Sequence, residues 1–458
     1  MLVTQAFDGA PIEEIPVDDS AGLARKLEQA ARCFADRPHW LPAYQRIEIL
    51  RRLARLMERE SDALAMMIAR EGGKPLADAR IETARAINGV EGAAGELEHL
   101  AGREIPMGLT PASRDRWAFT TKEPIGIVAA ISAFNHPLNL VVHQVAPAIA
   151  TGCPVIIKPA NTTPLSCRRF VQLAQEAGLP PAWCQTLFVD DNALAEALAT
   201  HPGIAFLSFI GSAKVGWHLR SKLAPGARCA LEHGGAAPVI VDRSVQIDSI
   251  IEPLVKGGYY HAGQVCVSVQ RIFVHADIMP RLVERLTERV RTLRVGDPTL
   301  PQTEMGPLIL PREVDRVAAW VQEARDGGAN VTTGGARISD RVYAPTVIVE
   351  PPATARVSRE EVFGPVTCVY GYTDLDEAIA RANSLPFAFQ AAVFTRDVDV
   401  ALKAARLLDA SAILVNDHTA FRTDWMPFAG RHQSGYNVGG IPYTMHDMSQ
   451  DKMIVFRW

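Results

Sequence analysis

The sequence lacks any apolar run long enough to cross a membrane. Its longest apolar stretches, such as residues 126–134, fall well short of the ~20 residues that a membrane-spanning helix requires. The first twenty residues, MLVTQAFDGAPIEEIPVDDS, carry acidic side chains and prolines, whereas a secretory signal begins with basic residues followed by an apolar stretch. We therefore expect a cytoplasmic protein with no membrane partner.

Paired cysteines and a dominant sign of charge are also absent. The seven cysteines are an odd set at irregular spacing without a CxxC pair, which argues against a disulfide framework and against a zinc or other metal site. Lys and Arg number 47 against 51 Asp and Glu, giving a net charge of -4, and the basic residues are spread along the chain. No patch for nucleic acid is indicated, so a small-molecule partner is expected.

The sequence does contain enough apolar residues for a large folded body. At 458 residues, 48% of them hydrophobic, the chain is expected to form two or three domains. The first hundred residues predict helices, because apolar residues recur at helical spacing over 21–34, 44–68 and 77–100. After Trp117 short apolar runs at 126–134, 154–158, 185–189 and 204–210 alternate with helical patterns such as 164–177 and 191–199. This alternation predicts an α/β fold with parallel strands and helical crossovers.

A second α/β stretch is predicted after the Gly234-Gly235 pair, where glycines let the chain cross between domains. Strands are expected near 237–242, 270–275, 345–349 and 365–371, and helices near 245–262, 279–293 and 375–383. Two strand-like segments stand apart, RWAFTTK at 116–122 and KMIVFRW at 452–458. We expect them to pair with each other as a small extension.

Cys266, in the segment YYHAGQVCVSVQRIF, is the candidate nucleophile. The small and polar residues Ala262-Gly263-Gln264 precede it, and they are expected to let a substrate approach the backbone beside the thiol. The alternative is a buried cysteine that packs as a small hydrophobe, which is expected for Cys33, Cys153, Cys167, Cys184, Cys229 and Cys368. Position alone does not separate the two interpretations.

Two polar residues are candidates for supporting a thiol. Asn135 breaks a strand in ISAFNHPLN, and at the carboxyl edge of a parallel sheet its amide can donate to a developing oxyanion, although such a segment is also typical of a simple turn. Glu232, in ALEHGGAAPVIV, follows an apolar pair. It is either a buried structural acceptor or, if it faces the thiol, a base for activating water.

Two further segments are candidates for binding a cofactor. In FLSFIGSAKVG a strand runs into Gly211-Ser212 and then into a helix that contains Gly216, so the helix start can receive a pyrophosphate, although an ordinary N-cap has the same residues. In VIIKPANTTP, Lys158 ends a strand and can bind ribose hydroxyls, or it is a solvated charge.

In this order, these segments resemble motifs of the aldehyde dehydrogenase superfamily over essentially the whole chain. The matching segments are EPIGIVAAISAFNHPLN, VIIKPANTTP, FIGSAKVG, LEHGGAAPVIV, GQVCVSVQRI, EEVFGPV and MPFAGRHQSG. The resemblance implies that Cys266 is the nucleophile, Asn135 the oxyanion donor and Glu232 the general base. It further implies that Lys158, Ser212, Glu361 and Phe363 contact NAD or NADP.

The resemblance also implies the domain organisation. A Rossmann-like NAD(P)-binding domain is expected over 1–115 and 124–234, and a catalytic α/β domain over 235–435. A small β extension is expected over 116–123 and 436–458, through which the chain forms a dimer or tetramer.

The sequence departs from the resemblance at three places. Asn161 stands where the NAD-specific pattern has a glutamate that repels a 2′-phosphate, so NADP is expected to be accepted alongside NAD or preferred. Ala429-Gly430 replaces a glycine pair, and His136 replaces an aromatic residue after the Asn.

Rival functions and the substrate stay open at this point. One rival is a CoA-acylating dehydrogenase, against which Glu232 argues, and a more distant one is a hydrolase that pairs Cys266 with a histidine, the candidates being His261, His136 and His233. The overall pattern looks most like lactaldehyde and glyceraldehyde dehydrogenases, which suggests a short hydroxy- or oxo-aldehyde. The arginines considered as partners of an anionic aldehyde are Arg114, Arg116, Arg271 and Arg422, each more typical of a solvated or ion-paired surface residue.

Overall fold

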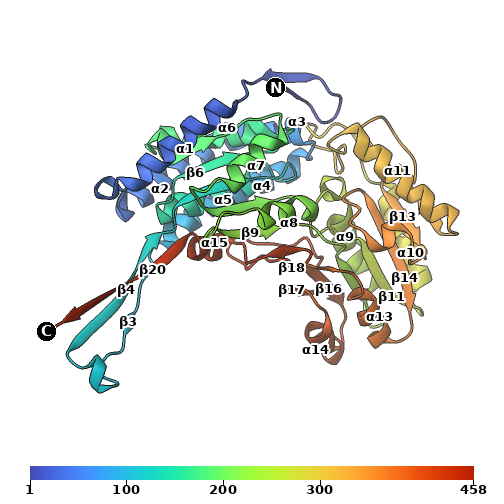
Figure 1. Ribbon diagram of the computed structural model, residues 1–458. Helices are drawn as coiled ribbons and strands as arrows, with labels where there is room; N and C mark the ends of the chain where they lie inside the picture. Colours follow the sequence, from blue (N-terminus) through green and yellow to red (C-terminus); the bar gives the residue numbers. More distant parts are fainter.

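The computed structural model describes residues 1–458 and has a mixed α/β architecture. Figure 1 shows two sheet-containing regions side by side and a long β extension that leaves the body and carries the C-terminus at its tip. The predicted fold class is confirmed. None of the helices combines the length and the apolar character needed to cross a bilayer.

The N-terminal region is helical, as predicted, but it begins with a β-hairpin that the apolar spacing did not indicate. Its elements are β1 (Leu2–Thr4), β2 (Pro11–Glu14), α1 (Ser20–Ala35), α2 (Ala43–Arg59), α3 (Ser61–Gly72) and α4 (Leu76–Glu96). The single helix expected over 44–68 is two helices. Glu60 separates them, because its backbone leaves the helical conformation at φ -104° and ψ 14°.

The first large sheet has the strand order β19-β9-β8-β5-β6-β7, with parallel pairing throughout except for β19. Its strands are β5 (Ile127–Ile131), β6 (Val155–Lys158), β7 (Cys184–Thr186), β8 (Ile204–Ile210), β9 (Arg228–Glu232) and β19 (Gly435–Tyr436). Its helices are α5 (Asn139–Thr151), α6 (Pro164–Glu176), α7 (Asn192–Thr200) and α8 (Ala213–Ser221). Four of these strands were predicted. They are nearly all apolar because helices cover both faces of a parallel sheet.

Strand β5 shows how the two faces are filled. Val128 and Ala130 belong to the apolar core on one face, which includes helices α2 to α6, whereas Ile127, Ala129 and Ile131 belong to the core on the other face. Successive side chains of a strand point to opposite faces, so this strand joins both cores and its carboxyl end is held in place.

The second large sheet has the strand order β12-β13-β14-β11-β10-β16-β17 and is parallel except at the β12 edge. Its strands are β10 (Pro238–Val241), β11 (Arg271–His275), β12 (Asn330–Thr333), β13 (Thr346–Val349), β14 (Val366–Tyr372), β16 (Gln390–Phe394) and β17 (Ala412–Val415). Around it lie α9 (Ile247–Tyr259), α10 (Met279–Arg291), α11 (Pro311–Asp326), α12 (Arg356–Arg359), α13 (Leu375–Ala382) and α14 (Val398–Leu407). The strands and helices predicted after Gly235 are confirmed.

The extension is a three-stranded antiparallel sheet in the order β20-β4-β3. Strand β4 (Arg116–Pro124) pairs with β20 (Ser449–Arg457) along its whole length, and β3 (Glu104–Ile105) lies on the other edge of β4. The predicted pairing of the two outlying segments is therefore confirmed. The remaining elements, β15 (Phe387–Ala388), β18 (Arg431–His432) and α15 (Ile441–Asp447), lie in the C-terminal part of the chain.

Candidate active site

A cleft of about 640 Å³ opens where the carboxyl ends of four parallel strands meet a loop of the second α/β region. Segments that follow β5, β6 and β8, together with the end of β9, line one side of it. A crevice outside the carboxyl ends of the strands is where open α/β sheets bind ligands. The cleft-lining residues include nine of the ten predicted site residues: Cys266, Asn135, Glu232, Lys158, Asn161, Gly211, Ser212, Glu361 and Phe363.

Gly216 is the predicted residue that does not line the cleft. It is buried in α8, and a Cβ atom there would stand 2.0 Å from Cε1 of His233. Glycine at this position therefore lets α8 pack against the His233 ring, which is a structural role and not a contact with a ligand.

The loop that carries Cys266 is built on an unusual backbone. His261, Ala262 and Gly263 all have positive φ, at 51°, 53° and 68°, in the turn η4 (Tyr260–Gly263) that follows α9. A Cβ on Gly263 would stand 2.1 Å from the carbonyl oxygen of Gly364. The expectation that Ala262-Gly263 opens a path for substrate is therefore wrong, because Gly263 is pressed against another part of the backbone.

Gln264 fixes the same loop with three hydrogen bonds. Its Nε2 donates to the carbonyl oxygens of His261 (3.1 Å) and Pro307 (3.2 Å), and its Oε1 accepts from the Ile309 amide (2.9 Å). A buried side-chain amide with its polar atoms bonded holds the backbone in one place. The position of the following thiol is set by this anchor.

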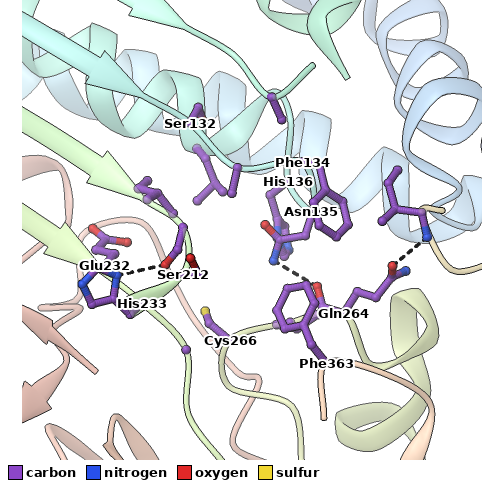
Figure 2. Close-up of a pocket in the computed structure, with 18 of the residues that line it drawn as sticks. Ser132, Phe134, Asn135, His136, Ser212, Glu232, His233, Gln264, Cys266 and Phe363 are labelled. Atoms are coloured by element: carbon purple, nitrogen blue, oxygen red, sulfur yellow. Dashed lines mark hydrogen bonds between the residues drawn. The ribbon is translucent and has the colours of Figure 1, made fainter. Parts of the chain in front are cut away.

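The Cys266 side chain is partly exposed to the cleft, and Figure 2 shows its sulfur pointing into the space between Asn135 and Glu232. Burial raises the pKa of the thiol to about 12, with the negative charges of Glu361 and Glu232 adding to the effect and the positive charge of Arg422 opposing it. At neutral pH the group is therefore a thiol and needs a proton acceptor before it can act as a nucleophile.

Asn135 is buried at the end of the turn that follows β5. Its Nδ2 donates to the carbonyl oxygen of Gln264 at 3.0 Å, so the amide is bonded to the backbone just before Cys266. An amide nitrogen has two hydrogens, and the bond to Gln264 uses one of them. The second remains available for a ligand in the cleft.

Glu232 ends β9 and is partly buried. Its Oε1 packs so closely on Gly439 that a Cβ on that residue would stand 2.0 Å away. Burial raises the pKa of the carboxyl, and the positive charge of Arg422 opposes that shift. A carboxyl group tuned toward neutrality is suited to accept a proton from water.

The position of the Glu361 carboxylate depends on the Gly234-Gly235 pair. Its Oε1 accepts from the Gly235 amide at 3.1 Å, and a Cβ on Gly234 would stand 1.7 Å from the same oxygen. Burial raises the pKa of this carboxyl to about 8. Two residues further on, Phe363 has a φ of +44°, and its ring meets Phe134 edge-on at 5.8 Å between centroids. Positive φ is strained for an aromatic residue, so packing holds this ring in the cleft.

At the other end of the cleft Lys158 ends β6, and its Nζ donates to Oδ1 of Asn161 at 2.7 Å. Burial lowers the pKa of the amine to about 8. Ser212 caps helix α8, but its hydroxyl makes no bond to the helix. The serine hydroxyl and the free amides of the first helical turn are therefore open to an anionic ligand.

The histidines proposed as partners of Cys266 are bonded to other groups or isolated. His136 bonds to the Tyr260 hydroxyl, His233 Nδ1 bonds to the Gly211 carbonyl, and neither ring nitrogen of His261 has a hydrogen-bond partner. Burial lowers the pKa of all three, so they are neutral at physiological pH. The structure therefore shows no Cys/His pair, which argues against the hydrolase.

The four arginines named from the sequence lie in different surroundings. Arg114 is exposed near the extension and Arg116 begins β4. Arg271 is buried in β11, and its guanidinium donates to three backbone carbonyls, those of Ala236, Arg381 and Ala382. Arg422 lines the cleft and forms no ion pair, so the expectation of a solvated or ion-paired surface residue is wrong both for it and for the buried Arg271.

Sequence reasoning missed three further arginines that line the cleft, Arg312, Arg316 and, in α4, Arg85. Its Nε and Nη2 donate to the two carboxylate oxygens of Asp424 at 3.2 and 2.7 Å. The two residues are 339 positions apart, so no local signal links them. The available clue was the acidic residue two positions after Arg422 in FRTDWMP.

The sequence and the structure of this chain both match known proteins. A model of the aldehyde dehydrogenase family matches residues 1–454. A 3-sulfolactaldehyde dehydrogenase of Priestia aryabhattai is 37% identical over 455 residues, which cover 99% of this chain and 94% of the relative.

Solved structures agree with the sequence match. Aldehyde dehydrogenase 21 of Physcomitrella patens, in complex with the reaction product succinate, has a TM-score of 0.96 at 32% identity and covers 100% of this chain and 95% of its own. Glyceraldehyde-3-phosphate dehydrogenase of Methanocaldococcus jannaschii, complexed with NADP, has a TM-score of 0.95 at 31% identity, covering 100% of this chain and 99% of its own. With the sequence motifs, the fold and the cleft in agreement with these matches, the chain belongs to the aldehyde dehydrogenase family.

Proposed function

We propose that this chain oxidises a short aldehyde to its carboxylic acid with NAD or NADP, through a thioester on Cys266. The observation that carries the proposal is the meeting of Cys266, Asn135 and Glu232 in one cleft that also contains the candidate cofactor contacts. A thiol, an amide donor and a tunable carboxylate are the three groups that thioester chemistry needs.

The first step is attack of the Cys266 sulfur on the aldehyde carbon. The thiol loses its proton to water in the cleft, the C–S bond forms, and the carbonyl oxygen becomes an oxyanion. The free N–H of Asn135 and the backbone N–H of Cys266 are the proposed donors to that oxyanion. The bond from Asn135 to the Gln264 carbonyl orients the amide in advance, so little reorganisation is needed during the reaction.

The cofactor contacts are proposed from the opposite end of the cleft. All five line the cleft, and we propose that Lys158 and Asn161 bind the adenosine ribose, that Gly211 and Ser212 at the start of α8 receive the pyrophosphate, and that Glu361 holds the nicotinamide ribose. A nicotinamide held by these residues would supply the acceptor for the hydride that leaves the former aldehyde carbon, which thereby becomes the thioester carbon. Phe363, fixed against Phe134, limits where a ring can lie in the cleft.

The last step is hydrolysis of the thioester. Glu232 takes a proton from water, the water oxygen bonds to the acyl carbon, and the C–S bond breaks to return the Cys266 sulfur. The raised pKa of Glu232 brings its proton affinity closer to what this step requires. The presence of this carboxyl in the cleft supports water over CoA as the acyl acceptor.

The cofactor choice follows from Asn161. Its side chain is neutral and accepts a hydrogen bond from Lys158, so no carboxylate at this position repels a 2′-phosphate. We propose that NADP is accepted as well as NAD. The relatives named for 3-sulfolactaldehyde and glyceraldehyde-3-phosphate support a short polar aldehyde as substrate.

We propose the domain division expected from the sequence, with cofactor binding over 1–115 and 124–234 and catalysis over 235–435. The segments 116–123 and 436–458 then form the extension through which copies of the chain associate as a dimer or tetramer. Exposed apolar side chains on it, among them Trp117, Phe456 and Trp458, support a contact with another copy. Cytoplasmic location, with no nucleic-acid or membrane partner, stays a prediction.

The decisive test replaces the nucleophile. Cys266→Ser should abolish aldehyde-dependent reduction of NAD and NADP, measured by absorbance at the wavelength of the reduced nicotinamide, because a serine hydroxyl lacks the nucleophilicity of a thiolate. Cys33→Ser, at another partly exposed cysteine, is the matched control and should keep the original rate. An unchanged rate in Cys266→Ser would overturn the proposal.

A further inference from the structure

Arg422 is a cation in the cleft that forms no direct ion pair, although the carboxylates of Glu232 and Asp424 lie close enough to favour its charge. Its Nη2 donates to Nδ1 of His143 at 3.3 Å, its Cζ lies 3.5 Å from the centroid of the Phe428 ring, and its Nε is buried without a hydrogen-bond partner. Burying a guanidinium with an unbonded N–H group is unfavourable unless an anion binds to it. Arg271 shows the contrast, because backbone carbonyls occupy its guanidinium on all sides.

Two hydrogen bonds, from Arg422 to His143 and from His143 to Asp424, hold Arg422 in this position. Burial lowers the pKa of His143 to about 4, so the imidazole is neutral at pH 7 and carries one N–H. Its Nε2 donates that hydrogen to Asp424 at 2.8 Å, which leaves Nδ1 as an acceptor for Arg422. The guanidinium is thereby oriented by a group that brings no negative charge to it.

Arg85 adds a second cation to the same wall of the cleft. Asp424 binds it through both carboxylate oxygens and also accepts from Asn139 and His143, so this one carboxylate is fully engaged. Burial lowers the pKa of Arg422 to about 10, with the positive charge of Arg85 adding to this effect and the negative charges of Glu232 and Asp424 opposing it. An anion that enters the cleft would relieve the repulsion between the two guanidiniums.

The site for such an anion lies beside the reacting thiol. Phe428, which carries the Arg422 guanidinium on its face, belongs to a small apolar cluster against which Cys266 packs. None of the residues bonded to Arg422 or Arg85 is among the proposed cofactor contacts. A charged group held here would therefore belong to the aldehyde and not to the cofactor.

We infer that the aldehyde substrate carries an acidic group, a carboxylate, sulfonate or phosphate, which Arg422 binds with the support of Arg85. The inference rests on the proposed function and adds the substrate class to it. Because Arg422 lies near Cys266, the acidic group must be separated from the aldehyde carbon by a short chain. A guanidinium with free N–H groups is suited to oxyanions of any of these three acids.

The kinetic test compares matched aldehydes. The wild-type enzyme should show a kcat/KM on the order of 10- to 100-fold higher for 4-oxobutanoate than for butanal, and higher for glyceraldehyde 3-phosphate than for glyceraldehyde, the range that one charge-assisted hydrogen bond provides. Arg422→Met, which keeps the aliphatic bulk, should bring the ratio of the two kcat/KM values close to 1, whatever its effect on the rate that the two aldehydes share. Arg422→Lys should keep part of it. Arg114→Met removes the same charge from an exposed site and should change neither substrate.

A binding measurement separates this inference from the proposed function. Succinate should bind the wild-type protein at least about tenfold more tightly than the uncharged butanamide by calorimetry, and Arg422→Met should abolish the difference. Equal binding of succinate and butanamide, or an equal loss with charged and neutral aldehydes in Arg422→Met, would overturn the acidic substrate while oxidation itself stands. Tight, Arg422-dependent binding of succinate without oxidation of any aldehyde would overturn the proposed function and support the anion site.

Discussion

Replacing Asn135 tests the geometry around Cys266 most directly. The Asn135 amide donates one hydrogen to the Gln264 carbonyl at 3.0 Å and has a second one free. In Asn135→Ala the proposed oxyanion loses this donor, which should lower kcat on the order of 10²- to 10³-fold. The KM for the aldehyde should change little, because the interaction forms fully only in the transition state. In Asn135→Asp the loss should be greater, since a carboxylate has no N–H and repels the oxyanion.

The same substitution has a calculable effect on stability. The buried Gln264 carbonyl loses its partner, at a cost of about 1–3 kcal/mol in the free energy of unfolding. The loop should stay in place, because the Gln264 side chain keeps its own three hydrogen bonds. Steady-state kinetics at saturating cofactor and denaturant unfolding measure the two effects separately. A kcat of Asn135→Ala within fivefold of the wild type would refute the role of the amide.

Three other predictions concern the carboxylates and the thiol. In stopped-flow measurements Glu232→Gln should still form about one reduced nicotinamide per site in a first burst, while its steady-state turnover falls about 10²- to 10⁴-fold. Loss of the burst would mean that Glu232 acts in the first step instead. Gly234→Ala puts a Cβ 1.7 Å from Glu361 Oε1 and should displace that carboxylate. The Michaelis constant for the cofactor should then rise at least about tenfold while the protein still folds. An unchanged Michaelis constant would exclude Glu361 as a cofactor contact. The pKa of Cys266 is raised to about 12, so the rate of its alkylation by iodoacetamide without cofactor should increase about tenfold per pH unit from pH 7 to 10. The rate measured with Cys266→Ser is subtracted to remove the other cysteines. A plateau of the rate near pH 9 would contradict that pKa.

The elements that sequence reasoning found and missed differ in their local chemistry. Strands β5, β6 and β8 are almost wholly apolar because they are covered on both faces, so a short apolar run bounded by turns predicted them well. Strand β9, RCALE, begins and ends with a charged residue that lies at the sheet edge or in the cleft, and the pattern did not identify it. The break at Glu60 was also missed, because the apolar spacing continues across it.

The sequence motifs identified most residues of the candidate site but not the contacts between them. Cys266, Asn135 and Glu232 occur in segments whose order along the chain resembles a known family, which is enough to expect their roles. Arg85 has no such signal, since its significance depends on a contact with Asp424 across 339 positions. Whether Arg422 is solvated or enclosed also depends on tertiary packing, and sequence alone gave the wrong answer.

Two glycines, Gly234 and Gly439, explain how two carboxylates can share a cleft with a thiol. Gly234 makes room for the Glu361 carboxylate and Gly439 makes room for that of Glu232, each at a distance that no Cβ would allow. Both carboxylates raise the pKa of Cys266, and a charge acts more strongly the closer it lies. Because each carboxylate is folded onto a glycine, its distance from the sulfur is set by the backbone and not by a mobile side chain. Arg422 opposes these negative charges from the other side, so an acidic group bound to Arg422 would weaken that opposition and raise the thiol pKa further. Because Asp424 neutralises Arg85, Arg422, Arg85 and Asp424 together carry one positive charge, which a singly charged acidic group on the substrate would cancel.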